Sequence, residues 1–236
     1  MPAFKHRSKE VEIMDNLLCK GEVVDQTLRE LETINRLLGG NKVTLQGIQQ
    51  LLIYQKPTHL SIADLGCGGG DILKLVADWG VSHRIRLALT GIDANPNIVA
   101  FAKRNSEGYP TIKYQALNIF SKEFKETQFD MVVATLFTHH FSDDELVALF
   151  TLLRKQTKIG IVINDLHRHW LAYYSIKFIT ALFSKSAMVK FDAPLSVLRG
   201  FTRKEIEALL AAAGIDNYTL HWKWAFRWQL VIRTQG

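Results

Sequence analysis

The sequence of 236 residues predicts an α/β protein with a parallel, doubly wound sheet. Strand-like and helix-like segments alternate from about residue 58 onward, and a glycine-rich loop joins the first strand of that series to its first helix. Hydrophobic residues make up 47% of the chain and charged residues 22%, which suits a folded protein with a substantial core. In such a sheet, we expect ligands to bind at the carboxyl ends of the strands.

The first 57 residues are predicted to form an N-terminal helical cap. Apolar residues recur with a helical period over residues 22–38, and two glycines then supply a stop. Residues 11–18 carry a similar apolar spacing and are predicted as another helix. We therefore divide the chain into a cap, residues 1–57, and a main domain, residues 58–236.

The main domain alternates strands with helices, as a doubly wound sheet requires. Ser142 and Thr202 each precede a glutamate by three residues, the pattern of a capping box that opens a helix. Strands are predicted over residues 60–64, 86–93, 112–116, 129–134, 160–165, 218–224 and 227–233. Helices are predicted over residues 71–77 and 97–104, from the first capping box to about 156, and from the second to 214.

The most informative stretch is the loop from Asp64 to Asp71, which reads Asp-Leu-Gly-Cys-Gly-Gly-Gly-Asp. It does not match the dinucleotide fingerprint, because Asp71 occupies the position of the third glycine. Two flanking carboxylates would repel a pyrophosphate but suit a ligand with an ammonium or sulfonium group. Asp93 ends the next strand, at the distance in sequence typical of a carboxylate that accepts hydrogen bonds from ribose hydroxyls. The sequence therefore predicts a cofactor that contains a nucleoside.

The same loop resembles motif I of the class I S-adenosylmethionine-dependent methyltransferases, and the resemblance extends over residues 58–236. It implies a Rossmann-like, seven-stranded sheet with the last strand antiparallel, and it implies binding of S-adenosylmethionine. The family usually has Asp where this chain has Asn118, which can still bond an adenine amino group but without charge. The cofactor contacts that the resemblance implies are Asp64, Gly66, Cys67, Gly68, Gly70, Asp93, Ala94, Asn95, Asn118, Ile119, Ala134 and Thr135.

Several classes of methyl acceptor can be set aside. The segment after the fourth strand lacks the D/N-P-P-Y/F pattern typical of methylation at nucleobase amino groups. Neither Cys19 nor Cys67 is placed for cytosine chemistry, because one lies in the cap and the other in the cofactor loop. Asp165 has no clear second acidic ligand beside it, so we expect no metal. A zinc ion held by the nearby histidines is the alternative.

Histidines remain as candidate catalytic bases. His139 and His140 follow the fourth strand and His167 follows the fifth, so all three are expected near the acceptor. A neutral imidazole can take a proton from a phenol or enol near pH 7. Asp165 could orient such a histidine, and Arg168 could pair with an acidic group of the substrate. The alternative is that His139 and His140 only cap or pack against the next helix.

Residues 166–201 are predicted to form a substrate lid. They include an apolar, aromatic stretch over residues 170–183 that leaves only a narrow polar stripe when drawn as a helix. In the lid interpretation, Trp170, Tyr173 and Tyr174 contact the acceptor. In the alternative, the helix simply packs against the N-terminal cap.

These observations favour O-methylation of a phenolic, quinol or polyketide-like small molecule, with C-methylation as the alternative chemistry. The N-terminal helices and the segment after the fifth strand are similar to those of bacterial quinone-methylase and polyketide-tailoring methyltransferases. An RNA or protein methyltransferase that uses the basic C-terminal third is one alternative, and a cofactor-binding module without catalysis is another.

Charge and localisation complete the prediction. The formal net charge is +6, and much of the basic excess falls in residues 166–201, away from the cofactor motifs. This favours an acidic or amphiphilic acceptor, or a surface that delivers it, over a nucleic acid. The two cysteines form no disulfide framework, and neither a signal peptide nor a transmembrane segment is evident, so we expect a cytoplasmic protein.

Overall fold

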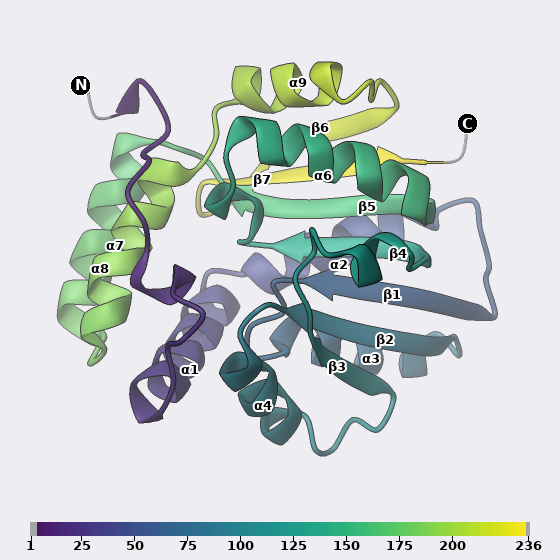
Figure 1. Cartoon of the computed structure of the whole chain (residues 1–236), viewed down its shortest axis with the longest axis horizontal. Coiled ribbons are helices and arrows are strands. Elements are labelled where there is room, and N and C mark those ends of the chain that lie inside the picture. The colour runs from purple at the N-terminus through teal and green to yellow at the C-terminus, as the bar shows by residue number, and fades with distance from the viewer. Residues whose placement is uncertain (1–3, 235–236) are drawn as a thin grey trace.

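A computed structural model describes residues 4–234. Seven strands form one sheet in the order β3-β2-β1-β4-β5-β7-β6 (Figure 1). Strands β1 to β5 are parallel, whereas β7 runs antiparallel to both of its neighbours. The predicted seven-stranded, doubly wound sheet with an antiparallel last strand is confirmed. The strands are β1 His59–Leu65, β2 Arg86–Asp93, β3 Ile112–Ala116, β4 Phe129–Thr135, β5 Thr157–Leu166, β6 Tyr218–Lys223 and β7 Arg227–Arg233.

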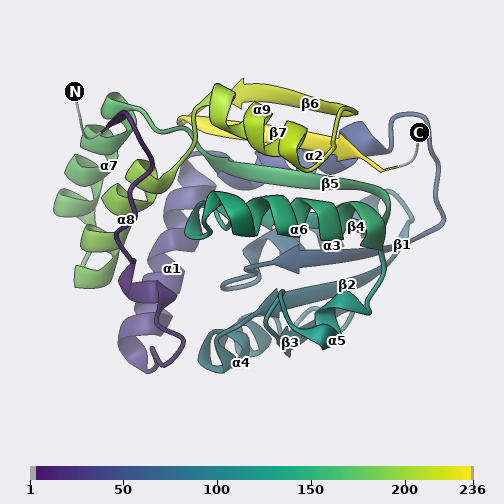
Figure 2. The same cartoon turned by 45° about the horizontal axis from the view of Figure 1, so that its top comes forward.

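Helices cover both faces of the sheet, and a separate group lies beyond the carboxyl ends of its strands (Figures 1 and 2). The helices are α1 Glu22–Leu37, α2 Gly40–Leu51, α3 Asp71–Ser82, α4 Pro96–Asn105, α5 Lys122–Lys125, α6 Asp143–Gln156, α7 Trp170–Phe183, α8 Ala187–Arg199 and α9 Arg203–Ala212. Alternation along β1 decides which helix meets which face. Leu60 and Ile62 pack with α2 and α3, while Ala63 and Leu65 pack with α6 and α9.

Helices α1, α7 and α8 form the separate group, and the N-terminal segment, residues 4–16, runs along α8. The Ser8 backbone N–H donates to Leu198 O at 3.0 Å. Asp192 of α8 accepts from the backbone N–H groups of Ile13 at 2.8 Å and Met14 at 3.1 Å. This arrangement closes the space above the strand ends.

The N-terminal region differs from its prediction in two ways. The helix expected over residues 11–18 is only a 3₁₀ turn, Ile13–Asp15, and Asp192 of α8 accepts from the first N–H groups of this turn. After α1, the chain turns at Gly39, whose φ is +71°, and continues as α2, which the sequence pattern did not predict. Helix α2 packs against β5 and β7, so part of the predicted cap region covers the sheet itself.

The remaining helix boundaries follow the sequence closely. Both capping boxes form, with Ser142 and Thr202 each exchanging hydrogen bonds with the glutamate three residues on. Helix α7 occupies the predicted aromatic stretch, and α3 runs five residues beyond its expected end. Within residues 4–234, no helix combines the length and the apolarity needed to cross a membrane.

Candidate active site

A cavity of about 870 Å³ lies at the carboxyl ends of the strands, where a doubly wound sheet binds its ligands. The glycine loop and the ends of β2 and β4 form its floor. The N-terminal segment, α1, α7, α8 and the turn between β6 and β7 form its walls.

The glycine loop lies close to the sheet because its backbone is tied to β2. The N–H groups of Gly66 and Cys67 both donate to Ile92 O, at 2.9 and 3.1 Å. Gly66 has a φ of +66°, and a Cβ there would lie 2.1 Å from the ring of Phe137. Only glycine meets both conditions, so the loop's conformation depends on this residue.

Acidic side chains line the cavity around this loop. Asp64 is buried, and its Oδ1 has no hydrogen-bond partner within residues 4–234. Burial, with Asp71 and Asp93 nearby, raises the pKa of Asp64 well above its usual range. Burial also raises the pKa of Asp93, although the Asn95 backbone N–H donates to it at 2.9 Å. Carboxylates in this state fit a ligand that offers N–H or O–H donors or positive charge.

Most of the predicted cofactor residues line this cavity. These are Asp64, Gly66, Cys67, Gly68, Asp93, Ala94, Asn118, Ile119 and Thr135. The other three, Gly70, Asn95 and Ala134, do not line the cavity. Gly70 caps α3 with a φ of +81°, and Asn95 caps α4 by accepting from Asn97 N at 2.9 Å. Ala134 belongs to the buried core under α6.

A buried histidine–aspartate pair forms part of the cavity wall. His139 Nδ1 lies 2.7 Å from Asp165 Oδ1, and Asp165 Oδ2 also accepts from Thr138 Oγ1 at 2.5 Å. Although burial disfavours its ionised form, the charge and hydrogen bond of His139 hold the pKa of Asp165 well below its usual range. The carboxylate therefore fixes the ring, with Nδ1 toward Asp165 and Nε2 toward Glu12.

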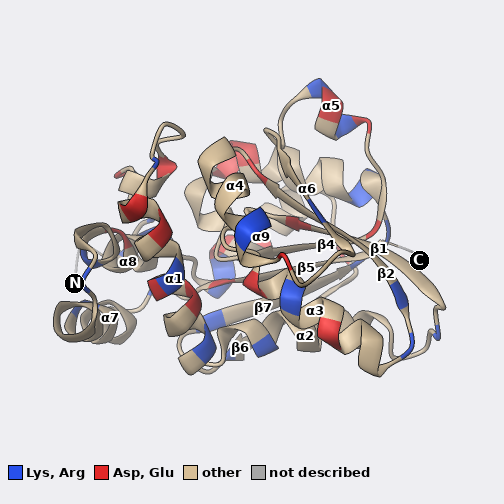
Figure 3. Cartoon of the chain, turned by 90° about the horizontal axis from the view of Figure 1, so that it is seen from below, with Lys and Arg blue, Asp and Glu red and all other residues tan. Residues whose placement is uncertain are grey.

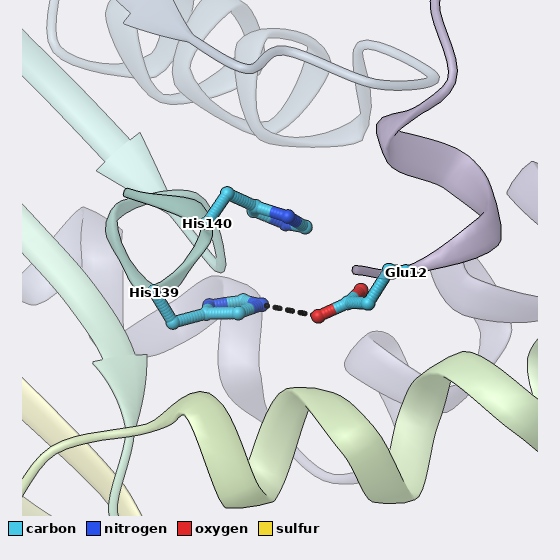
Figure 4. Close-up of side chains that lie close together, drawn as sticks. All are labelled: Glu12, His139 and His140. Carbon is cyan, nitrogen blue, oxygen red and sulfur yellow. Dashed lines mark ion pairs between the residues drawn. The ribbon is translucent and has the colours of Figure 1, made fainter. Parts of the chain in front are cut away.

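A glutamate from the N-terminal segment faces the histidine of this pair. Glu12 Oε1 lies 3.6 Å from His139 Nε2, and neither atom has a hydrogen bond to any described residue (Figure 4). Burial raises the pKa of Glu12 to about 7. Glu12 carries no sequence signal, because it lies far from any motif and is brought to the cavity only by tertiary contacts.

His140 is held by a second acidic residue of the same segment. Its Nδ1 lies 2.6 Å from Asp15 Oδ1, and Arg199 donates to the other oxygen of Asp15 at 2.6 Å. Burial disfavours the ionised form of Asp15, but these two hydrogen bonds hold its pKa well below the usual range.

Glu12, His139 and His140 each offer a ligand atom within 4.8 Å of the others. Figure 4 shows the two imidazoles lying one above the other, and their ring centroids are 4.2 Å apart with planes tilted by 33°. Stacked rings direct their lone pairs side by side rather than toward one point. Arg199 also lies 3.6 Å from Glu12 Oε1. The arrangement therefore offers a metal ion no single point of convergence, and Arg199 beside Glu12 also disfavours a cation there.

Two predicted site residues after β5 lie outside the cavity wall. His167 accepts a hydrogen bond from Trp222 Nε1 at 3.2 Å and packs on Trp228. Arg168 is buried, with its guanidinium bonded to Glu205 at 2.6 Å and to Gly200 O at 2.6 Å. Each nitrogen of the Arg168 guanidinium thus already donates to a protein acceptor, and its pairing with an acidic substrate group stays a prediction.

The aromatic residues of α7 also face away from the cavity. Trp170 is 49% exposed and Tyr174 51% exposed, and Tyr173 packs edge-on against Phe4. The inner face of α7 lines the cavity instead, through Ala172, Ser175, Ile176 and Ile179. The predicted acceptor contacts Trp170, Tyr173 and Tyr174 therefore do not line this cavity, and Ser184, just after α7, donates to Glu30 of α1 at 2.5 Å.

Known proteins that are similar in sequence or structure indicate what this chain resembles. Residues 62–160 match the sequence profile of a family described as a methyltransferase domain. No curated protein matches the chain by sequence.

Among solved structures, the chain is similar to human N-acetylserotonin methyltransferase in complex with S-adenosylmethionine, with 17% identity and a TM-score of 0.62. That match covers 89% of this chain but only 55% of the human one. A plantazolicin methyltransferase in complex with S-adenosylhomocysteine gives 15% identity and a TM-score of 0.65, covering 89% of this chain and 94% of that one. An S-adenosylmethionine-dependent methyltransferase from Aquifex aeolicus gives 15% and 0.61, with coverages of 89% and 98%. At these identities, the structural likeness concerns the fold.

Proposed function

Because the chain carries a class I S-adenosylmethionine-dependent methyltransferase domain, we propose that it methylates a hydroxyl group of a small, largely apolar molecule. The observation that carries this proposal is the buried Asp165–His139 pair, which faces Glu12. This pair lies in the wall of the cavity whose floor is the glycine loop.

When bound, S-adenosylmethionine supplies an electrophilic methyl group on a sulfonium. The residues present fit this cofactor. The unpartnered Oδ1 of Asp64 suits its ammonium group, Asp93 suits its ribose hydroxyls, and the glycine loop admits it without a Cβ in the way.

We assign proton removal from the acceptor hydroxyl to the Glu12–His139 pair. Asp165 keeps a proton on Nδ1 of His139, so Nε2 is the basic atom, and Glu12 Oε1 lies 3.6 Å from it. A carboxyl group with a pKa of about 7 exchanges protons readily at neutral pH. The proton that leaves the acceptor oxygen can therefore reside on either partner.

The cavity walls support a small, apolar acceptor. Leu31, Ile34, Ile176, Ile179 and Val197 line the side that α1, α7 and α8 form. The similar solved structures include enzymes named for N-acetylserotonin and for plantazolicin. A cavity lined by many acidic residues disfavours a polynucleotide acceptor. We also infer that the protein acts in the cytoplasm, because its two cysteines form no disulfide.

The test is the variant His139→Gln, assayed for turnover on a panel of phenols and for S-adenosylmethionine affinity by calorimetry. We expect the affinity to change little and turnover to fall about 10²- to 10⁴-fold, the usual contribution of general base catalysis. His167→Gln is the matched control, because His167 lies outside the cavity wall and should keep full turnover. Unchanged turnover in His139→Gln would contradict the assignment.

A further inference from the structure

Arg227 is a buried cation that forms no ion pair with a described residue, although the charges of Asp165 and Asp71 act on it from a distance. The residue is 2% exposed, and burial lowers the pKa of its guanidinium to about 10. Its acceptors are two amide oxygens, Asn35 Oδ1 at 2.8 Å and Asn164 Oδ1 at 3.5 Å. In the part of the chain that the structure describes, its Nε has no hydrogen-bond partner.

The two other buried arginines show what a structural guanidinium looks like in this protein. Arg168 pairs with Glu205, and Arg199 pairs with Asp15, each at 2.6 Å. Within residues 4–234, no carboxylate forms an ion pair with Arg227. Asp165 and Asp71 offset part of the cost of burying this charge, but its Nε is buried without a hydrogen-bond partner among the described residues, which points to a ligand.

The fold holds this guanidinium in place at the cavity wall. Arg227 begins β7, directly after a turn in which Ala225 and Phe226 both have positive φ angles, of +60° and +54°. Its guanidinium packs against the start of α2, where a Cβ on Gly40 would lie 2.6 Å from Cζ. A strained turn and a close approach to a glycine both fix a side chain that lines the cavity.

The charge of the cavity makes this position distinctive. Among the described residues that line the cavity, Arg227 is the only arginine, and there is no lysine. The acidic residues that line the cavity are Glu12, Asp15, Glu32, Asp64, Asp71, Asp93, Glu145 and Asp192. An anionic group on any ligand in this cavity therefore has one guanidinium to bind.

We propose that Arg227 binds a carboxylate group of a ligand in this cavity. Two ligands of the proposed reaction, on which this inference rests, could bring that group: the methionine part of the cofactor, or an acidic acceptor. A guanidinium matches a carboxylate with two parallel N–H donors, and here Nε is free to be one of them.

The cofactor source is tested by calorimetry with S-adenosylmethionine and decarboxylated S-adenosylmethionine, which keeps the sulfonium and the amine. If the cofactor carboxylate is bound, the wild-type protein should bind the decarboxylated compound about tenfold or more weakly, the usual effect of a charged hydrogen bond. Arg227→Gln should weaken S-adenosylmethionine by a similar factor and leave the decarboxylated compound unchanged.

The acceptor source is tested with 4-hydroxybenzoate and its methyl ester, in the presence of saturating S-adenosylhomocysteine. If the acceptor brings the carboxylate, the wild-type protein should bind the acid about tenfold or more tightly than the ester, and Arg227→Gln should abolish this preference. Neither experiment requires turnover, so a failure of the proposed methyl transfer would leave this test intact.

The matched control is Arg233→Gln, at the other end of β7, where the arginine donates to Gln50 O at 2.8 Å outside the cavity. It should bind all four compounds as the wild type does. If the wild-type protein distinguishes neither the two cofactors nor the two benzoates, the proposal is overturned, whether or not Arg227→Gln folds. The proposal is also overturned if a folded Arg227→Gln variant binds each of the four compounds with the same affinity as the wild-type protein.

Discussion

Glu12 holds a carboxyl group where its ionised form is disfavoured, so its titration should be visible in stability. Between about pH 4.5 and 7, the folded protein keeps a proton on Glu12 that the unfolded chain releases. The contribution of this group to the free energy of unfolding therefore falls as pH rises through that window. The loss is at most about 3 kcal/mol, from 1.36 kcal/mol for each unit of pKa.

Glu12→Gln removes this titration. Relative to wild type, we expect the variant to gain stability between pH 5 and pH 8, measured by urea unfolding at both values. Glu10→Gln is the control, because Glu10 is exposed on the same segment and should follow wild type. A difference between Glu12→Gln and wild type that is equal at both pH values would argue against a raised pKa.

Asp93 tests the cofactor side of the cavity. Asp93→Ala should weaken S-adenosylmethionine about 10- to 100-fold, because it removes a charged acceptor from the ribose hydroxyls. The affinity is measured by calorimetry. Asp216→Ala is the control, because it removes the same charge from an exposed position. Full affinity in Asp93→Ala would show that the ribose lies elsewhere.

Helix α7 presents apolar side chains on both of its faces. Its inner face lines the cavity, while Trp170, Leu171, Tyr174, Phe178, Leu182 and Phe183 are exposed. Figure 3 shows this helix almost entirely in tan, since Lys177 is its one charged residue. Side chains that remain in water add little to the free energy of folding.

Phe178→Ser should therefore change the free energy of unfolding by no more than about 0.5 kcal/mol, the usual range for surface positions. Phe178 is 65% exposed. Val189→Ser, in α8, should cost about 2 kcal/mol or more, because Val189 is 1% exposed and the hydroxyl would be buried with it. Urea unfolding of both variants checks this; a large loss in Phe178→Ser would mean that α7 packs against something through its outer face.

Periodicity predicted most elements because each strand and helix of the main domain buries one regular face. It could not assign the faces of α7, because apolar residues occur all round this helix. Helix α2 was missed because it follows directly on Gly39, which the pattern interprets as a stop.

The residues of the candidate site also differ in whether the sequence alone could predict them. Asp64, Asp93 and the loop glycines carry a local pattern and could be found in the sequence. Glu12 and Arg227 carry none, since only the folded chain brings them to the cavity. The basic excess of residues 166–201 also acquires a different meaning, because Arg168 and Arg199 are buried in ion pairs.

At the scale of the whole molecule, the N-terminal segment depends on α8. Asp192→Asn should loosen residues 4–16, because an amide presents a donor where Asp192 now accepts from Ile13 N and Met14 N. We expect hydrogen exchange of this segment to speed up about tenfold or more, the equivalent of losing one buried hydrogen bond, while exchange in β4 and β5 stays as in wild type. Unchanged exchange in the segment would mean that Arg199 and Arg7 hold it without Asp192.

The contacts of this segment have a consequence for the order of assembly. Its hydrogen bonds reach Asp192 from Ile13, Arg199 from Asp15 and His140 from Asp15, across 179, 184 and 125 residues of chain. During synthesis, residues 4–16 can therefore dock only after α8, which lies far later in the sequence, has been made. During synthesis, the sheet and its glycine loop can form while the side of the cavity that holds the base is still open.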